Sequence, residues 1–136
     1  MADRTEVTLR NPKVYRSFIT NGRHIVEADE PEDFGGFDSA MNPVELVLAG
    51  LAECKAVTVR AKAAQLGVEL GEIRATVGIE TTRGEGRALA SKVDVKLDWD
   101  GATSEEQREK ILTSTSRCFV HRMLQGSFDI ETSYND

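Results

Sequence analysis

The stretch NPVELVLAGLAECKAVTV, residues 42–59, decides the fold of this chain. Asn42 suits the N-cap of a helix, and Pro43 suits its first position. Glu45 stands three residues after the cap, where a capping box places its carboxylate. Gly67 marks the end of the same helix. The sequence therefore predicts one helix of about 24 residues, roughly 36 Å long at the standard rise per residue.

The run Leu46–Ala52 within this helix is apolar on every face, so we expect it to be buried on several sides. Two carboxylates, Glu45 and Glu53, and the thiol of Cys54 interrupt the apolar pattern. A cysteine in such surroundings is most often a small packing residue, because free cysteine is among the most buried residue types. The helix alone leaves open whether Cys54 packs or reacts.

The rest of the chain predicts an α+β fold in a single domain, residues 1–136. Asn21-Gly22 is a dipeptide favoured in hairpin turns, so the first strands should form an antiparallel meander. The element order is βββα followed by ββααβ. Strand patterns occupy residues 6–10, 13–20, 23–28, 72–82, 92–99 and 127–134, and helical patterns occupy residues 104–118 and 118–126.

The polar loop EPEDFGGFDSAM, residues 30–41, precedes the long helix and contains Phe34 and Phe37. Loops of this length within a domain are often functional. The alternative is a plain connector whose two phenylalanines pack against the core.

Charge and composition exclude several classes of function. Lys and Arg number 17 against 23 for Asp and Glu, a formal charge of -6, so nucleic acid is not an expected partner. The longest apolar run is too short to cross a membrane, and we expect a soluble cytoplasmic protein. Two cysteines 64 positions apart do not form a secreted disulfide scaffold. In a reducing compartment they are either packed thiols or a redox couple.

Cys54 and Cys118 could act together if the fold brings them close. A thiolate that attacks a peroxide becomes a sulfenic acid, and a second thiol can capture it as a disulfide. This requires the two Cα atoms to lie within about 7 Å, which spacing in the sequence does not show. His121 is a conceivable base for Cys118, although a lone histidine in a helix is more often filler.

The thiolate also needs a cation nearby. Arg10, Lys13, Arg16 and Arg60 are candidates, whereas Lys55 points about 100° away from Cys54 around the helix. Glu45 has a structural role in the capping box, and a functional role would be to hold a guanidinium. Glu45 and Cys54 lie on opposite faces of the helix, about 13 Å apart along its axis. A shared site would therefore need another segment or another subunit.

Two motifs together resemble the OsmC/Ohr family of thiol-dependent peroxidases. They are NPVELVLAGLAEC, residues 42–54, and CFVHRMLQG, residues 118–126; DEPEDFGG, residues 29–36, also looks like that family. The resemblance implies an intertwined homodimer, with long central helices packed between the two sheets and active sites near the subunit interface. In such a dimer the partner chain could bring Glu45 to the site.

The resemblance also implies a chemistry. Cys54 would be the peroxidatic thiol and Cys118 the resolving one, with Glu45 and an early-strand cation beside them. That cation is Arg16 or one of its neighbours, Arg10 and Lys13. The implied substrates are small hydrophobic hydroperoxides, and the implied reductant is an external dithiol such as a lipoylated protein or a small thiol. No metal and no organic cofactor are implied.

Two hypotheses follow from the sequence. The first is thiol-dependent reduction of organic hydroperoxides, with Phe34, Phe37, Phe119 and Met123 as apolar walls. The alternative is a non-enzymatic dimer that binds a small ligand and keeps both cysteines as core residues.

Overall fold

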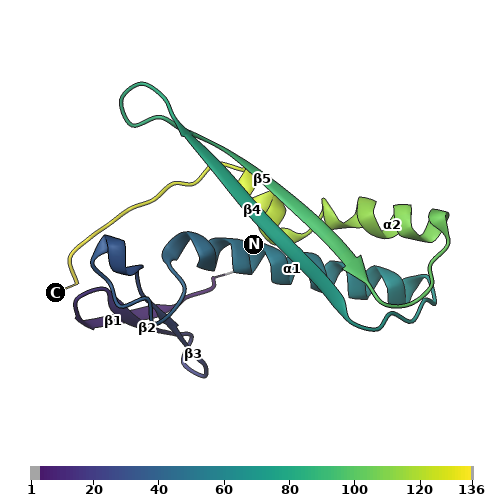
Figure 1. Ribbon diagram of the computed structural model, residues 1–136, viewed down its shortest axis with the longest axis horizontal. Coiled ribbons are helices and arrows are strands. Elements are labelled where there is room, and N and C mark those ends of the chain that lie inside the picture. The colour runs from purple at the N-terminus through teal and green to yellow at the C-terminus, as the bar shows by residue number, and fades with distance from the viewer. Residues whose placement is uncertain (1–3, 136) are drawn as a thin grey trace. The chain divides into compact units, whose positions relative to one another are not determined.

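A computed structural model describes residues 4–135 and confirms the α+β class (Figure 1). The chain forms two compact units, of which one ends at Val47 and the other begins at Leu48. The first unit contains a three-stranded sheet, and the second contains a two-stranded sheet with helices.

The sheet of the first unit is the antiparallel meander that the sequence predicts. It has the order β1 (Thr8–Lys13), β2 (Arg16–Thr20), β3 (Ile25–Ala28). The expected strand break after Arg10 is wrong, because β1 continues to Lys13 through a register shift. Pro12 is tolerated there since β1 is an edge strand. Between β2 and β3, the Asn21 side chain accepts hydrogen bonds from the amides of Arg23 and His24 and closes the turn.

Helix α1 (Pro43–Gln65) has the bounds that its local signals predict. It ends in a Schellman motif. Gly67, with φ of 71°, donates to the Ala64 carbonyl at 3.1 Å, and Val68 donates to the Ala63 carbonyl at 2.9 Å. Of the apolar run Leu46–Ala52, however, only Leu51 is buried, so the expected burial on several sides is not met within this chain. Covering every face of a helix requires neighbours on every side.

A long hairpin follows, formed by β4 (Ile73–Arg83) and β5 (Leu89–Trp99). The pairing extends to Arg83 and Leu89, so β5 starts three residues earlier than predicted and the connecting loop is shorter, while β4 keeps its predicted length. Helix α2 (Glu105–Thr115) starts with a capping box between Ser104 and Gln107. Figure 1 shows α2 running beside the C-terminal half of α1.

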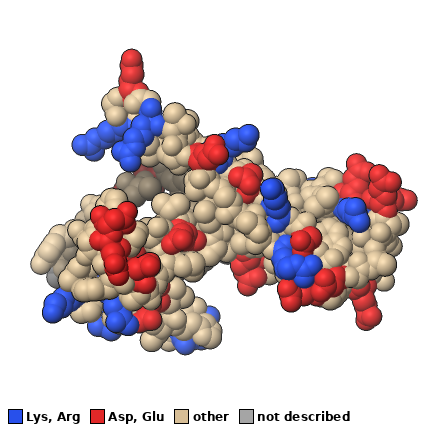
Figure 2. Space-filling view, in the orientation of Figure 1, with Lys and Arg blue, Asp and Glu red and all other residues tan. Residues whose placement is uncertain are grey.

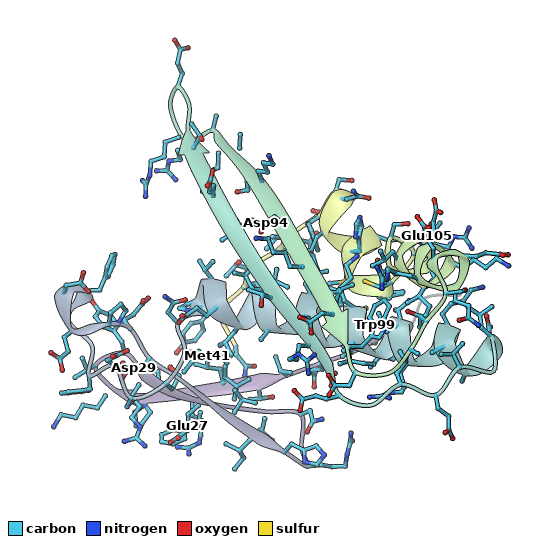
Figure 3. All side chains as sticks on the ribbon, turned by 45° about the vertical axis from the view of Figure 1, so that its right-hand side comes forward. Glu27, Asp29, Met41, Asp94, Trp99 and Glu105 are labelled. Carbon is cyan, nitrogen blue, oxygen red and sulfur yellow. The ribbon has the colours of Figure 1, made fainter. Side chains whose placement is uncertain are left out.

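The core of the second unit lies where α1 and α2 meet. Val59, Ala63 and Ile111 are its buried members. Trp99, labelled at the end of β5 in Figure 3, is one of the partly buried residues that pack against them. The others are Leu66, Val68, Leu70, Ile73 and Leu97.

Two predictions about the C-terminal part of the chain are wrong. The first helix ends at Thr115 rather than at Cys118, because Cys118 takes an extended conformation and becomes the N-cap of α3 (Phe119–Gln125). Residues 127–135 form no strand, since no described strand pairs with them, and Phe128 and Ile130 are exposed. The described order is therefore βββα-ββαα, without the final strand.

The surface and the helices bear on the expected partners. The face drawn in Figure 2 carries Lys and Arg side chains interspersed with Asp and Glu, so this face offers no continuous basic surface. None of the helices within residues 4–135 has the length and apolar character needed to cross a membrane.

Candidate thiol site

The two cysteines meet where α1 faces the start of α3. The Cys54 sulfur accepts a hydrogen bond from the Val120 amide at 3.5 Å, and the Cys118 sulfur accepts one from the next amide, that of His121, at 3.4 Å. Both cysteines are free, and the Cys54 side chain is close enough to influence the pKa of the Cys118 thiol. The structure therefore brings together two residues that are 64 positions apart in the sequence.

The surroundings of the two thiols differ. Cys118 is buried, with 4% of its surface exposed, whereas Cys54 is half-buried. Burial raises the pKa of the Cys118 thiol, and the neighbouring Cys54 side chain raises it further. The His121 amide and the charge of Lys55 act in the opposite direction. Cys118 is therefore held mainly as a thiol at neutral pH.

Lys55 is the residue of this site that the sequence analysis placed wrongly. It was set aside as a partner for the thiolate because it points about 100° away from Cys54, yet only 3% of Lys55 is exposed and its side chain lies in the core. A signal for this burial is present in the sequence. The buried residues of α1 are Leu51, Lys55, Val59 and Ala63, a stripe with a spacing of four residues that places Lys55 on the core face.

Two contacts hold the Lys55 side chain. Its Nζ donates to the Thr115 carbonyl at 2.6 Å and lies 2.6 Å from His121 Nδ1. The Thr115 carbonyl also accepts from the Cys118 amide at 3.3 Å, so Lys55 and Cys118 share one acceptor at the end of α2. His121, which the sequence offered only as a conceivable base, thus contacts both Lys55 and Cys118.

The other two predicted site residues make their contacts in the first unit. Glu45 forms the capping box: its carboxylate accepts from the Asn42 amide at 2.9 Å, and its amide donates to the Asn42 side chain at 2.9 Å. Arg16 is paired with Glu27 at 2.7 Å, which raises the pKa of Arg16, and it stacks 5.4 Å from the centre of the Phe18 ring. The role of Glu45 as a cap is therefore observed.

A concave surface of the first unit gathers the early-strand cations. About 450 Å³ of space is lined by Lys13 and Arg16 together with Pro12, Phe18 and Phe37. Arg10 lies close by, 5.5 Å from the centre of the Phe18 ring. Two of the three early-strand cations, Lys13 and Arg16, thus line the same hollow as Phe37 of the loop.

The loop before α1 is ordered by Asp29, a residue that the sequence analysis missed. This buried carboxylate accepts from the Ser39 hydroxyl at 2.6 Å and from the amides of Glu30, Phe37 and Ser39. The Asp29 amide donates to the carbonyl of Met41 at 3.1 Å, which joins the two ends of the loop. Figure 3 labels these two residues close to each other. Asp29 therefore closes the loop at its base.

The reading of this loop as a plain connector with two packed phenylalanines is wrong. Phe34 is 72% exposed and Phe37 is 61% exposed. The loop instead has a defined shape with its aromatic side chains outward, since Asp29 satisfies its amides from within.

The fold is thus an α+β chain in which a long helix and the start of α3 place two free cysteines near one another. A family model described as OsmC-like protein matches residues 36–133. The chain therefore belongs to the OsmC-like protein family, which confirms the resemblance inferred from its motifs. No curated protein matches the sequence.

Solved structures support the same fold. An OsmC-like protein from Mycoplasma pneumoniae is 18% identical, with a TM-score of 0.76 over 93% of this chain and 90% of that one. An organic hydroperoxide resistance protein OsmC from Legionella pneumophila is 18% identical, with a TM-score of 0.70 over 93% and 92%. An organic hydroperoxide resistance protein from Elizabethkingia anophelis, with thiocyanate bound, is 20% identical, with a TM-score of 0.70 over 93% and 91%. At these identities the likeness shows the fold alone.

Proposed function

We propose that this protein reduces organic hydroperoxides with Cys54 as the attacking thiol and Cys118 as the resolving thiol. The observation that carries the proposal is that two free thiols accept hydrogen bonds from consecutive amides at the start of α3, those of Val120 and His121. Two structural relatives are named organic hydroperoxide resistance proteins, which supports the same substrate class.

The reaction has two chemical steps. The Cys54 thiolate attacks the terminal oxygen of ROOH, so that a S–O bond forms and the O–O bond breaks. The alkoxide that leaves takes up the proton that the Cys54 thiol released and becomes ROH. The Cys118 sulfur then attacks the sulfur of the sulfenic acid, forming the disulfide and releasing water. An external dithiol, a lipoylated protein or a small thiol, reduces the disulfide by thiol exchange.

The different surroundings of the thiols fit this division of roles. Burial and the Cys54 contact raise the pKa of Cys118, which leaves it the poorer nucleophile toward free peroxide. Cys54 is more exposed than Cys118 and so is the sulfur that a substrate reaches first. The exposed Phe119 and Met123 on α3 offer an apolar surface for the organic part of the peroxide.

The proposal includes a homodimer in which Arg16 and Glu45 serve the thiolate of Cys54. Large apolar side chains of α1 remain exposed in the single chain, among them Val44, Val47 and Val57, and a second copy would cover them. Light scattering after gel filtration should give twice the mass of one chain. A monomer at micromolar concentration would contradict this part of the proposal.

The test of the reaction uses the two cysteines as each other's controls. Reduced protein receives an equimolar amount of cumene hydroperoxide, and thiols are counted with intact mass measured alongside. Both thiols should disappear with the loss of two hydrogens in mass. Cys118→Ser should stop at a sulfenic acid that dimedone traps, and Cys54→Ser should keep its thiol. Survival of both thiols in the unmodified protein would refute the proposed function.

Glu45 allows catalysis and capping to be separated. Glu45→Gln keeps the capping box, because glutamine bonds the N-cap amide as glutamate does, but it removes the charge. We expect slower oxidation of Cys54 at an unchanged unfolding temperature. An oxidation rate equal to that of the unmodified protein would restrict Glu45 to its structural role.

A further inference from the structure

Lys55 is a buried cation without an anionic partner. Its described contacts are a carbonyl oxygen and an imidazole nitrogen, and within residues 4–135 no salt bridge includes it. Removing an ammonium group from water costs several kcal/mol unless charge or hydrogen bonds compensate. A buried lysine that lacks a carboxylate therefore favours any negative charge that forms nearby.

The thiol of Cys118 is the place where such a charge would form. Cys118 and Lys55 share the Thr115 carbonyl, and His121 contacts the Cys118 sulfur through its amide and Lys55 through its ring. The charge of Lys55 also lowers the pKa of Cys118 against the effects of burial and of Cys54. Lys55 and Cys118 are thus both bonded to Thr115 and to His121, Lys55 through its ammonium and Cys118 through its amide and its sulfur.

We propose that Lys55, positioned by Thr115 and His121, stabilises the thiolate of Cys118 while it forms the disulfide with Cys54. This inference rests on the proposed function and names a residue that serves its second step. The lysine supplies charge from the helix that carries Cys54, so the attacking sulfur of Cys118 has a cation independent of the early-strand arginine.

The bonds and protons of this step balance without a further reactant. The Cys118 sulfur supplies the electron pair of the new S–S bond, and the S–O bond of the Cys54 sulfenic acid breaks. The proton that Cys118 loses ends on the departing hydroxide, giving water. The ammonium group of Lys55 lowers the energy of the thiolate that forms between these events.

Thr115 and His121 are positioning residues in this scheme. The carbonyl at the end of α2 carries the negative end of the helix dipole, which favours a cation there. An ammonium group can only donate hydrogen bonds, so Nδ1 of His121 must accept one. The other charged side chains next to the cluster in sequence, Glu53, Arg117 and Arg122, are exposed.

The experiment compares Lys55→Met with a matched change of charge on the same helix, Lys62→Met. After an equimolar addition of cumene hydroperoxide, we expect Lys55→Met to lose the Cys54 thiol at the unmodified rate. Its sulfenic acid should then persist and give more dimedone adduct. For a pKa increase of one unit at Cys118, disulfide formation slows about threefold, since the thiolate fraction falls tenfold while its nucleophilicity rises. Lys62→Met should behave as the unmodified protein.

A second measurement needs no peroxide and separates this inference from the proposed function. Reduced protein is alkylated with iodoacetamide across a range of pH, and the modification of Cys118 is followed by mass spectrometry. In Lys55→Met the midpoint for Cys118 should move to higher pH, whereas Lys55→Arg should keep it near the original value. If Lys55→Met does not fold, Lys55→Gln carries the test, because it keeps a donor to Thr115 without the charge.

The outcomes decide between the two proposals. An unchanged Cys118 midpoint in Lys55→Met, or an equal shift in Lys62→Met, would overturn the role of Lys55. Slower loss of the Cys54 thiol with an unchanged Cys118 midpoint would show that Lys55 acts on Cys54 instead of Cys118. That result would overturn the proposed role as well. If the unmodified protein does not react with peroxide but Lys55→Met still shifts the alkylation midpoint of Cys118, the proposed function fails. The electrostatic interaction between Lys55 and Cys118 then stands.

Discussion

The packing of Ile111 provides a quantitative test of how α2 is held against α1. Ile111 has 0% of its surface exposed and packs with Val59 and Ala63. Ile111→Ala removes three carbons at about 0.8 kcal/mol each and leaves a cavity, so the free energy of unfolding should fall by about 3 kcal/mol. With an unfolding entropy of about 2.1 cal/mol/K per residue, the melting temperature should fall by roughly 10 °C.

The assay is chemical and thermal unfolding at one fixed protein concentration, because any dimer makes stability depend on concentration. Ile111→Val should cost only about 1 kcal/mol, since it removes a single carbon. Thr113→Ala, at an exposed position of the same helix, serves as control and should change stability by less than about 0.5 kcal/mol. A loss below about 1 kcal/mol for Ile111→Ala, or an equal loss for Thr113→Ala, would refute this account of the core.

Three further predictions concern single groups. Because burial raises the pKa of Cys118, its alkylation midpoint should lie above the ordinary thiol value of about 8.5, and a midpoint at or below that value would contradict its surroundings. The Ser39 hydroxyl and the loop amides lower the pKa of Asp29 in the folded protein. The unfolded state therefore binds a proton at Asp29 more tightly, and the stabilisation that this carboxylate gives above about pH 4 is lost as the pH falls. Urea titrations should therefore show the advantage of the natural protein over Asp29→Asn shrinking below about pH 4, and a constant difference would argue against it. A Cβ at Gly36 would lie 2.0 Å from the Glu30 carbonyl oxygen, so Gly36→Ala should speed proteolysis of the loop, while Gly50→Ala, with open space around it, should not.

The sequence predicted those features that depend on neighbouring residues. The bounds of α1 follow from Asn42, Pro43 and Gly67, whose effects act within one or two turns. The two hairpins follow from alternation and turn residues for the same reason. The end of α2 was mispredicted because a helical pattern continues past Thr115, and nothing local shows that Cys118 leaves the helix to cap the next one.

The candidate site was only partly predictable because its contacts join distant segments. Both cysteines were recognised, but their proximity depends on how α3 packs against α1. Lys55 was misjudged because its position was compared with that of Cys54 alone. The spacing of four residues from Leu51 through Lys55 to Val59 places the lysine on the buried stripe, yet an acceptor for its charge lies 60 residues later, at Thr115.

The separation of Cys54 and Cys118 along the chain affects how stable the oxidised protein would be. Everything from the second half of α1 through the β4–β5 hairpin to the end of α2 lies between Cys54 and Cys118. A bond between them would turn this arm into a covalent ring, which by chain entropy opposes unfolding by about 4 kcal/mol. Oxidation would therefore raise the free energy of unfolding of this half of the molecule, and reduction would lower it again. The resistance of the protein to denaturant would report the oxidation state of the two cysteines.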